Sequence, residues 1–546
     1  MKNSNKIFAE AVKKHQENKL DEAEIMYEQI LKIDPKHAAT LHALGLLLTS
    51  KKEYKRATQL IKKAISLKAH EVYYHNLGAL FGRQGKNQNA VEMYEKAIKL
   101  NPRYAEAYYS LGVTLKDLGK TDDAINMFEK TIVLNPMHAE CYNNLGVVLQ
   151  EKGNIEDAML MLTKVIELNP KHAVAYNNLG VIFQESHKTQ DAISMFAKAI
   201  ELDPSIATAY NNIGMIYTDF ARIEDALSMY EKAIELDPGY SDAYWNKAIS
   251  LLTLGRFEDG FKLYEWRWET KYKSIKEKYI KPLWLGEESL QDKTILIHSE
   301  QGYGDTIQFC RYLDMVADLG AHIIFEVEEA LLPLMQQLTA VKEFITKGSV
   351  LPEFDYHCPL LSLPLAFKTS LETIPSFEKY LYADMQKVAV WQNRLGEKKE
   401  PRVGIVWSGS KTHKNDFNRS IELQKLLKVL PKEYQYFSLQ KDLRENDAEI
   451  LEVFNIKHYA EELQNFADTA ALISCMDFVI SVDTSIAHLA GSLGKETLIL
   501  LPFSADWRWL QDREDTPWYP SVTLLRQKSI NNWEDVLSLL SYLEKT

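Results

Sequence analysis

The sequence predicts an all-α superhelix of two-helix repeats, followed by an α/β region built on two parallel sheets. Two observations carry this prediction. Five prolines recur at steps of 34 residues in the first half of the chain, at positions 102, 136, 170, 204 and 238. A period of this length indicates stacked units of supersecondary structure. After residue 273 the helical rhythm stops, and short apolar runs alternate with helical segments, as in parallel sheets.

Composition limits the class of protein. The chain has 546 residues, of which 46% are hydrophobic and 26% charged, and its net charge is −12. This balance is typical of globular domains and excludes wholesale disorder. A net negative charge argues against a nucleic-acid partner, because the phosphate backbone is negative as well.

The four cysteines stand far apart without a Cys-x-x-Cys motif, which favours a reduced, cytoplasmic setting. The N-terminus has no apolar segment of a signal peptide. No run approaches the roughly 18 apolar residues of a membrane span. We therefore expect a cytoplasmic protein without a membrane segment.

The repeats follow a fixed internal pattern. Each unit predicts two amphipathic helices, for example over residues 105–118 and 121–134, with small residues where the helices press closest. The 34-residue Leu-Gly…Ala…Pro pattern resembles the tetratricopeptide repeat, with about eight units over residues 3–270. The small residues are Gly45, Gly78, Gly112, Gly146, Gly180 and Gly214 on the first helices and Ala90, Ala124, Ala158, Ala192 and Ala226 on the second.

A superhelix of such repeats has a concave groove that commonly holds an extended peptide. A polar column precedes the Leu-Gly pairs, and an amide side chain can both donate to and accept from a peptide backbone. This column predicts a ladder that grips a protein acceptor, with capping or solvation as the alternative. A parallel tyrosine column favours packing between helices. The polar column consists of Asn76, Ser110, Asn144, Asn178, Asn212 and Asn246.

The second half predicts two Rossmann-like units, over residues 273–398 and 399–546. Strands are expected at 294–298, 322–327, 403–407, 478–482 and 497–501, several of them followed by a turn and a helix. Ligands of open α/β sheets bind at the carboxyl ends of the strands. We therefore expect a cleft between the two units.

Three motifs carry a resemblance for this half. GYGDTIQFCRYL (302–313), WSGSKTHKNDFNRSI (407–421) and SVDTSIAHLAGSLG (481–494) together resemble heptosyltransferase-like glycosyltransferases of the GT-B architecture. The whole layout is similar to the O-linked N-acetylglucosamine protein transferases. The resemblance implies a tetratricopeptide superhelix followed by a GT-B-like region with two Rossmann-like subdomains. The first subdomain is short, so the repeats are expected to complete the acceptor side.

The same resemblance makes Asp305 the candidate general base that takes the proton of the acceptor hydroxyl. Asp305 ends a Gly-Tyr-Gly turn, where glycines let a ligand approach the backbone. Capping of the following helix is the alternative role. His298 and Glu300 lie in the same turn and are rival bases. Gln308 and Arg311 follow, and one of them is expected to face the cleft.

The nucleotide-sugar donor is assigned to two segments of the second unit. The turn at Asp483, Thr484 and Ser485 opens a helix that carries His488, and helix N-termini favour anions. The loop that contains Ser408, Lys414 and Arg419 offers a cation for the leaving group. Helix capping and a solvated loop are the respective alternatives. The Trp507-Arg508-Trp509 cluster is expected either to wall the pocket or to pack in the core.

These assignments predict a protein O-glycosyltransferase that transfers a sugar from a nucleotide sugar to Ser or Thr of a protein, for which a flagellin-like acceptor is suggested by the resemblance alone. The chain has no Asp-x-Asp triplet and no cluster with metal-ligand spacing, so no metal and no cofactor besides the co-substrate is expected. Two alternatives remain open. One is a saccharide- or lipid-acceptor transferase that uses the repeats for recruitment, and the other is a non-catalytic repeat scaffold.

Overall fold

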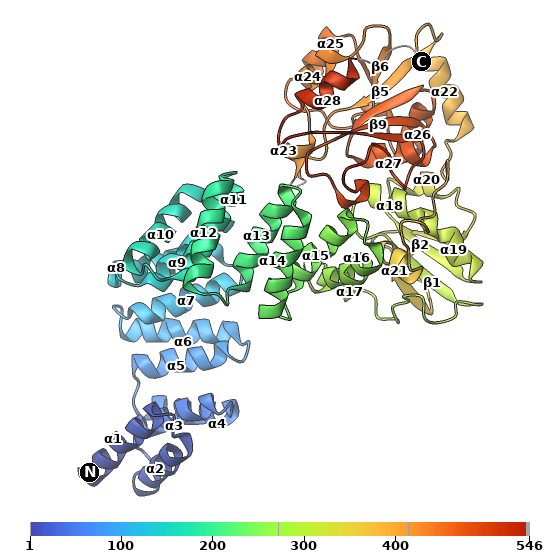
Figure 1. Cartoon of the computed structure of the whole chain (residues 1–546). Coiled ribbons are helices and arrows are strands. Elements are labelled where there is room, and N and C mark those ends of the chain that lie inside the picture. The colour runs from blue at the N-terminus through green and yellow to red at the C-terminus, as the bar shows by residue number, and fades with distance from the viewer. Residues whose placement is uncertain (1, 271, 413–414, 542–546) are drawn as a thin grey trace. The chain divides into compact units, whose positions relative to one another are not determined.

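The computed structural model describes residues 2–270, 272–412 and 415–541. The chain divides into two compact units, Met1–Ala209 and Tyr210–Thr546. Figure 1 shows helices alone in the first unit, and helices together with two sheets in the second.

The first unit is a stack of antiparallel helix pairs, which confirms the predicted repeats. The glycine column is explained by contact within each pair, because a Cβ atom on Gly112 would lie 2.7 Å from Phe128 and one on Gly180 would lie 2.6 Å from Phe196. The helices are α1 (Lys2–Gln16), α2 (Leu20–Ile33), α3 (Ala38–Ser50), α4 (Tyr54–Leu67), α5 (Glu71–Gly82), α6 (Asn87–Leu100), α7 (Ala105–Asp117), α8 (Thr121–Leu134), α9 (Ala139–Glu151), α10 (Ile155–Leu168), α11 (Ala173–Glu185) and α12 (Thr189–Leu202).

The second unit begins with the last repeats. Their pattern continues through the predicted end of the array near residue 270. The helices are α13 (Ala207–Asp219, which starts before the unit boundary), α14 (Ile223–Leu236), α15 (Ser241–Thr253), α16 (Phe257–Tyr264), the 3-10 helix η1 (Glu265–Glu269) and α17 (Lys273–Lys276).

A four-stranded parallel sheet follows, in the order β3-β2-β1-β4. Each strand runs into a helix or turn at its carboxyl end, as predicted for a doubly wound unit. The elements are β1 (Thr294–His298), α18 (Tyr303–Phe309), η2 (Cys310–Tyr312), α19 (Leu313–Asp318), β2 (His322–Val327), α20 (Leu332–Met335), β3 (Val341–Thr346), β4 (Tyr356–Pro359), η3 (Leu360–Ser362) and α21 (Leu363–Ala366).

The second sheet has six parallel strands in the order β10-β9-β8-β5-β6-β7. The order reverses between β5 and β8, and this switch point is where doubly wound sheets bind ligands. The elements are α22 (Met385–Leu395), β5 (Arg402–Val406), α23 (Asp416–Arg419), α24 (Leu423–Val429), β6 (Gln435–Ser438), α25 (Asp447–Val453), β7 (Lys457–His458), η4 (Ala460–Glu462), α26 (Phe466–Ser474), β8 (Phe478–Val482), α27 (Ser485–Ser492), β9 (Glu496–Leu501), η5 (Trp507–Trp509), β10 (Val522–Arg526) and α28 (Glu534–Leu540).

Helix α22 corrects the predicted boundary between the two halves. The sequence pattern places it at the end of the first half, but it packs against α26 of the second. Lys387 forms an ion pair with Asp468 at 2.5 Å, and the Trp391 ring lies 5.2 Å from that of Tyr459. The second half therefore begins before residue 385.

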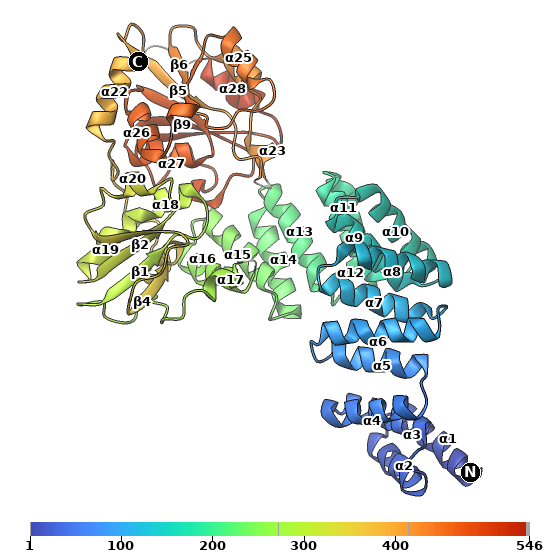
Figure 2. The ribbon, with the colours of Figure 1, turned by 180° about the vertical axis from the view of Figure 1, so that it is seen from behind.

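The last repeat helices share one hydrophobic core with both sheets. Phe257, Phe261 and Tyr264 are buried in the same cluster as the strand side chains of β1 and β8. Figure 2 shows α16 beside the first sheet, where it contacts α21. The second unit is thus an α/β body with its own repeat helices built into it.

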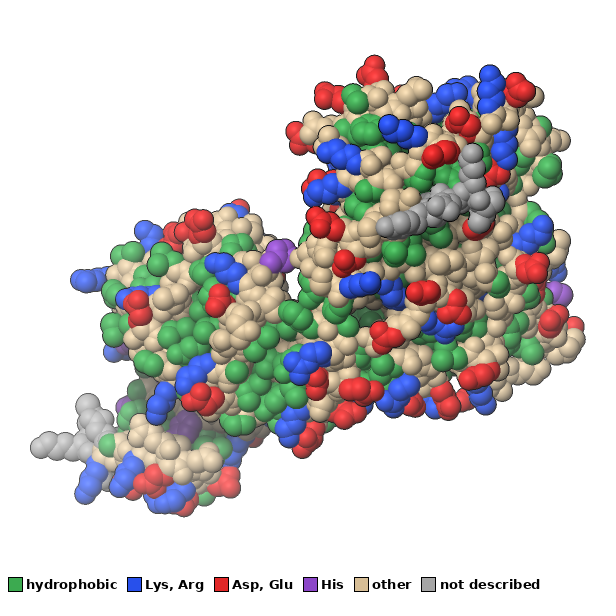
Figure 3. All heavy atoms as spheres, turned by 45° about the horizontal axis from the view of Figure 1, so that its top comes forward, with side chains coloured by type: hydrophobic (Ala, Val, Ile, Leu, Met, Phe, Trp, Pro, Cys, Tyr) green, Lys and Arg blue, Asp and Glu red, His purple; other side chains and the backbone are tan. Residues whose placement is uncertain are grey.

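The surface of the second unit carries both signs of charge. Acidic and basic side chains are interspersed over the face shown in Figure 3. Within the described ranges, no helix is long and apolar enough to cross a membrane.

The shared core predicts that the last repeats are required for the second unit to fold. A fragment of residues 206–546 is expected to melt in one cooperative transition. The fragment 273–546 lacks Phe257, Phe261 and Tyr264, and it is not expected to show a cooperative transition. In the full chain, Phe261→Ala is expected to lower the free energy of unfolding by about 3–5 kcal/mol. Circular dichroism melts measure both effects, with the exposed Val390→Ala as control. Cooperative melting of 273–546 would refute this dependence.

Candidate functional site

Two turns from different sheets meet at the centre of the second unit. One follows β1 and opens α18, and the other follows β8 at the switch point and opens α27. The helices are so close that a Cβ atom on Gly304 would lie 2.8 Å from Cδ2 of His488. The structure therefore brings together the two segments that the sequence assigned to base and donor.

A cavity of about 480 Å³ lies between these turns. This volume is within the range of small-molecule sites, roughly 300–1,000 Å³. Its charged side chains come from both halves: Asp305 from the first, and Arg419, Asp483, Asp506 and Arg508 from the second. Its hydroxyl groups belong to Tyr272, Tyr303, Ser410, Thr484 and Ser485, and His488 lies on the same wall.

Asp305 both caps its helix and pairs with a cation. Its Oδ2 accepts a hydrogen bond from the backbone N–H of Gly302 at 2.8 Å, and its Oδ1 forms an ion pair with Arg508. Burial raises the pKa of Asp305, and the Arg508 charge opposes this rise. The side chain keeps 16% of its surface exposed, so a ligand in the cavity can reach it.

The rival bases are buried and do not line this cavity. Glu300 forms two hydrogen bonds with Arg267, at 2.7 and 2.9 Å. Nε2 of His298 lies 3.2 Å from Nδ1 of His357, and burial holds the pKa of His298 well below its usual value. These contacts make both residues structural, which leaves Asp305 as the exposed carboxylate of the turn.

Neither Gln308 nor Arg311 lines the cavity. Both are buried, and Arg311 donates to the carbonyls of Trp518 and Pro375 and to the Tyr380 hydroxyl. The expectation that one of them faces the cleft is therefore wrong. Arg311 instead links the first half to the linker and to the second half.

The N-terminus of α27 supplies several donors to the cavity. Thr484 is the N-cap residue, its hydroxyl lies 3.3 Å from that of Ser481, and Ser485 follows at the first helical position. Burial lowers the pKa of His488 to about 3, so the ring is neutral. Its Nδ1 lies 2.9 Å from the Tyr519 hydroxyl. If that hydroxyl donates, the ring carries its proton on Nε2 and can donate it to a ligand.

Of the described residues of the predicted donor loop, Gly409, Ser410 and Arg419 line the cavity. Arg419 lies on its wall and donates to the carbonyl oxygen of Asp483 at 3.2 Å. Ser408 is a correction, because it is buried and its backbone is held by Gln440 rather than presented to the cavity. Lys414 lies outside the described residues.

Arg508, which the sequence offered only as part of a cluster expected to wall the pocket or to pack in the core, lies on the cavity wall, and Asp506 beside it was not assigned. Nη1 of Arg508 contacts Asp506 at 2.7 Å, while Nη2 contacts Asp305. The only sequence signal is their place in the aromatic cluster after β9. Both tryptophans of that cluster are buried: Trp509 stacks on His488 with ring centroids 5.1 Å apart, and Trp507 also lines the second cavity described below.

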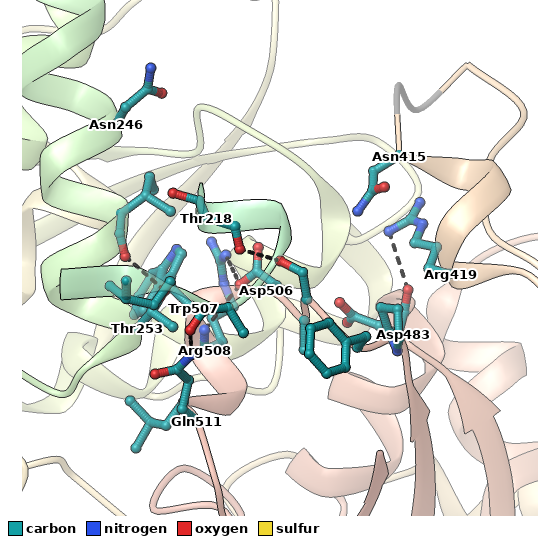
Figure 4. Close-up of a pocket in the computed structure, with 18 of the residues that line it drawn as sticks. Thr218, Asn246, Thr253, Asn415, Arg419, Asp483, Asp506, Trp507, Arg508 and Gln511 are labelled. Atoms are coloured by element: carbon teal, nitrogen blue, oxygen red, sulfur yellow. Dashed lines mark hydrogen bonds and ion pairs between the residues drawn. The ribbon is translucent and has the colours of Figure 1, made fainter. Parts of the chain in front are cut away.

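A second cavity, of about 410 Å³, lies beside the first (Figure 4). Helices α13 and α15 of the last repeats contribute Thr218, Asn246 and Thr253 to it, and the second half contributes Phe503 and Gln511. The two cavities share five lining residues: Gln301, Arg419, Asp483, Asp506 and Arg508.

The asparagines of the polar column form hydrogen bonds with side chains of neighbouring repeats. Nδ2 of Asn246 donates to Oδ1 of Asn211 at 2.9 Å, and Nδ2 of Asn178 donates to Oδ1 of Asn143 at 3.0 Å. Asn144 donates to the Tyr109 hydroxyl, and Asn76 contacts His42, at 2.9 Å each. These hydrogen bonds hold neighbouring repeats together. Asn212 of the same column is half-buried, so part of its surface stays exposed.

Comparison with known proteins identifies the repeats. Tetratricopeptide-repeat family models match residues 14–37, 38–71, 78–119, 105–136, 139–172, 161–194 and 207–240. The first half of the chain is a tetratricopeptide-repeat array. Among the described residues, no group of three or more His, Cys, Asp or Glu side chains is placed to hold a metal ion.

Relatives share these repeats over part of their length. Protein FlbA of Caulobacter vibrioides is 26% identical over 279 residues, which is 46% of each chain. The repeat-containing protein MJ1428 of Methanocaldococcus jannaschii is 31% identical over 15% of each chain. The chain thus spans less than half the length of the curated relatives it matches.

Solved structures are similar to part of this chain. MamA is 30% identical, with a TM-score of 0.27, over 30% of this chain and 95% of its own. YrrB, described as a repeat protein with an unusual peptide-binding site, is 25% identical, with a TM-score of 0.30, over 34% of this chain and 95% of its own.

The close approach of α18 and α27 predicts a clash in Gly304→Ala. Alanine in a helix ordinarily stabilises relative to glycine by roughly 0.5–1 kcal/mol, but here the added Cβ meets the His488 ring at 2.8 Å. We expect the free energy of unfolding to fall by about 1–3 kcal/mol. Denaturant titration measures it, with Gly302→Ala as control because its Cβ finds its nearest atom at 3.4 Å. A stabilised Gly304→Ala protein would contradict this close contact of the two helices.

Proposed function

We propose that this chain is a glycosyltransferase of the GT-B type that transfers a sugar from a nucleotide sugar to Ser or Thr of a protein acceptor. The observation that carries the proposal is the wall shared by the two cavities. A donor in the first cavity and an acceptor in the second would meet at Asp483, Asp506 and Arg508. Two substrates held on either side of one set of charged groups is the arrangement that group transfer requires.

Several features of the first cavity suit a nucleotide diphosphate. The α27 N-terminus presents backbone N–H groups together with the Thr484 and Ser485 hydroxyls, and such helix ends favour phosphate. Arg419 adds a permanent positive charge on the same wall. The order reversal between β5 and β8 places this wall where doubly wound sheets bind their ligands.

The second cavity suits a polypeptide acceptor. Trp245 and Asn246 on α15 line it next to Phe503 and Gln511 of the second half. Asn246 has one amide N–H tied to Asn211, which leaves its carbonyl oxygen able to accept from a peptide N–H. The first sheet has only four strands, and the last repeats cover the side of the site that it leaves open.

The reaction balances with the groups present. The acceptor hydroxyl oxygen forms a bond to the anomeric carbon while the bond from that carbon to the phosphate oxygen breaks. Asp305 takes the hydroxyl proton, and the nucleoside diphosphate leaves with its negative charge facing Arg419 and the α27 N-terminus. A single displacement of this kind inverts the anomeric centre.

Donor binding is the first test. Binding to the folded state at 100 times the dissociation constant adds about 2.7 kcal/mol of stability, so at least one of the UDP-, GDP- and ADP-sugars should raise the melting temperature. The Thr484→Ala/His488→Ala double variant should lose this shift. Asp305→Asn should keep it but transfer sugar roughly 10²–10⁴-fold more slowly. If no nucleotide sugar shifts the wild type, the donor site is wrong.

The acceptor site is tested separately. Asn246→Ala removes one hydrogen-bonding amide from the second cavity and should raise KM for a protein acceptor about 2–10-fold, with nucleotide binding unchanged. Lys247→Ala is the matched control, because its side chain pairs with Glu231 and does not line the cavity. Equal KM values for both variants would favour a saccharide or lipid acceptor and repeats that serve recruitment.

A further inference from the structure

Arg508 is a buried cation shared by two carboxylates. Its side chain is 8% exposed and contacts Asp305 from α18 and Asp506 from its own loop. The Phe309 and Trp507 rings lie 5.9 and 4.5 Å from its guanidinium carbon. This position on the wall of both cavities places it next to any ligand that enters either one.

Two donors at this wall have no hydrogen-bond partner within the described part of the chain. They are Nε of Arg508 and Nε of Arg419, both buried. A buried guanidinium N–H without an acceptor costs free energy, which a ligand oxygen can recover. Both side chains belong to the cavity wall, but these two nitrogens are themselves buried, so they reach the non-bridging oxygens of a diphosphate only when the side chains turn.

We propose that Arg508 exchanges partners when a nucleotide diphosphate binds, leaving Asp305 for a phosphate oxygen and thereby freeing Asp305 to act as the base. Arg508 is then a residue that couples occupation of the donor site to activation of the base. This inference rests on the proposed function, because it takes the first cavity as the donor site.

The exchange follows from charge. Without ligand, Arg508 faces two carboxylates, and its proximity opposes the rise that burial causes in the pKa of Asp305. A diphosphate brings about two negative charges and competes for the same guanidinium. Once Arg508 has turned away, burial acts on Asp305 unopposed, so the carboxylate becomes a stronger base.

The other charged groups around Asp305 also favour a raised pKa of its carboxyl. Asp506 and Glu328 are negative and raise its pKa further. His488 is neutral, and Tyr272 lies on the same cavity wall. The cation that holds Asp305 ionised is therefore Arg508. When Arg508 turns away, the proton affinity of the Asp305 carboxylate increases.

Calorimetry of the full chain tests the exchange without requiring sugar transfer. Binding of a nucleotide sugar is measured in buffers of different ionisation enthalpy between pH 5 and 7, where the diphosphate diester keeps its charge. The heats report the protons taken up on binding. We expect wild type to take up more protons than Asp305→Asn, by up to about one per chain at the acid end of this range and fewer as the pH rises, because Asp305 acts as the base only while it is ionised. Uptake that remains in Asp305→Asn belongs to other groups, such as Asp483.

Two further variants keep the test decisive if Asp305→Asn does not fold. Arg508→Gln frees Asp305 beforehand, so it should bind about 10–100-fold more weakly and lose the same part of the proton uptake. Asp318→Asn, an exposed carboxylate on α19, is the control and should match wild type.

Equal uptake in wild type, Asp305→Asn and Arg508→Gln, or no binding of any nucleotide sugar, would overturn the exchange. The outcomes separate the two proposals. Proton uptake of the expected size without sugar transfer to any acceptor would leave the exchange intact and refute the transferase. Sugar transfer without this proton uptake would support the transferase and refute the exchange.

Discussion

The contact of Arg508 with Asp305 and Asp506 is the interaction on which the site depends. It joins the turn after β1 to the loop after β9, and so fixes the two halves of the second unit around one cavity. Breaking a buried pair by removing one partner leaves an uncompensated charge, which commonly costs about 3–5 kcal/mol. This charge network lines a cavity rather than closing the core, so its charged groups lie next to any ligand that enters. Arg419 and the α27 N-terminus face the same space and add to its positive side.

The fusion of the last repeats with the α/β body gives the second cavity its shape. Phe257, Phe261 and Tyr264 belong to the common core, and Asn246 on the neighbouring helix faces the second half. The repeats therefore have two distinct tasks. Those of the first unit form an array held by interrepeat hydrogen bonds such as that of Asn178 with Asn143, whereas the last ones form part of the site itself. A polypeptide held there would be presented to the same charged wall as the donor.

The sequence predicted what depends on local periodicity. The 34-residue spacing of glycine and proline located the repeats, because each glycine faces a bulky residue of its partner helix, as Gly112 faces Phe128. The strand-turn-helix pattern placed Asp305 and Thr484 at the carboxyl ends of strands, where open α/β sheets bind their ligands. The two strands belong to different sheets, and both turns line the same cavity. The role of Arg508 could not be predicted, because its partner Asp305 lies 203 positions earlier in the chain. Ser408 was misplaced for the same reason, since the Gln440 that holds its backbone lies 32 residues later, in the loop after β6.

The most direct test of the donor site is hydrogen exchange of the full chain with and without a nucleotide sugar that binds. We expect slower exchange of backbone amides at 302–306, at 484–488 and around Arg508 together, because one ligand fills the space between those turns. Slower exchange confined to other parts of the chain, or at only one of the two turns, would show that the cavity between the halves is not the donor site.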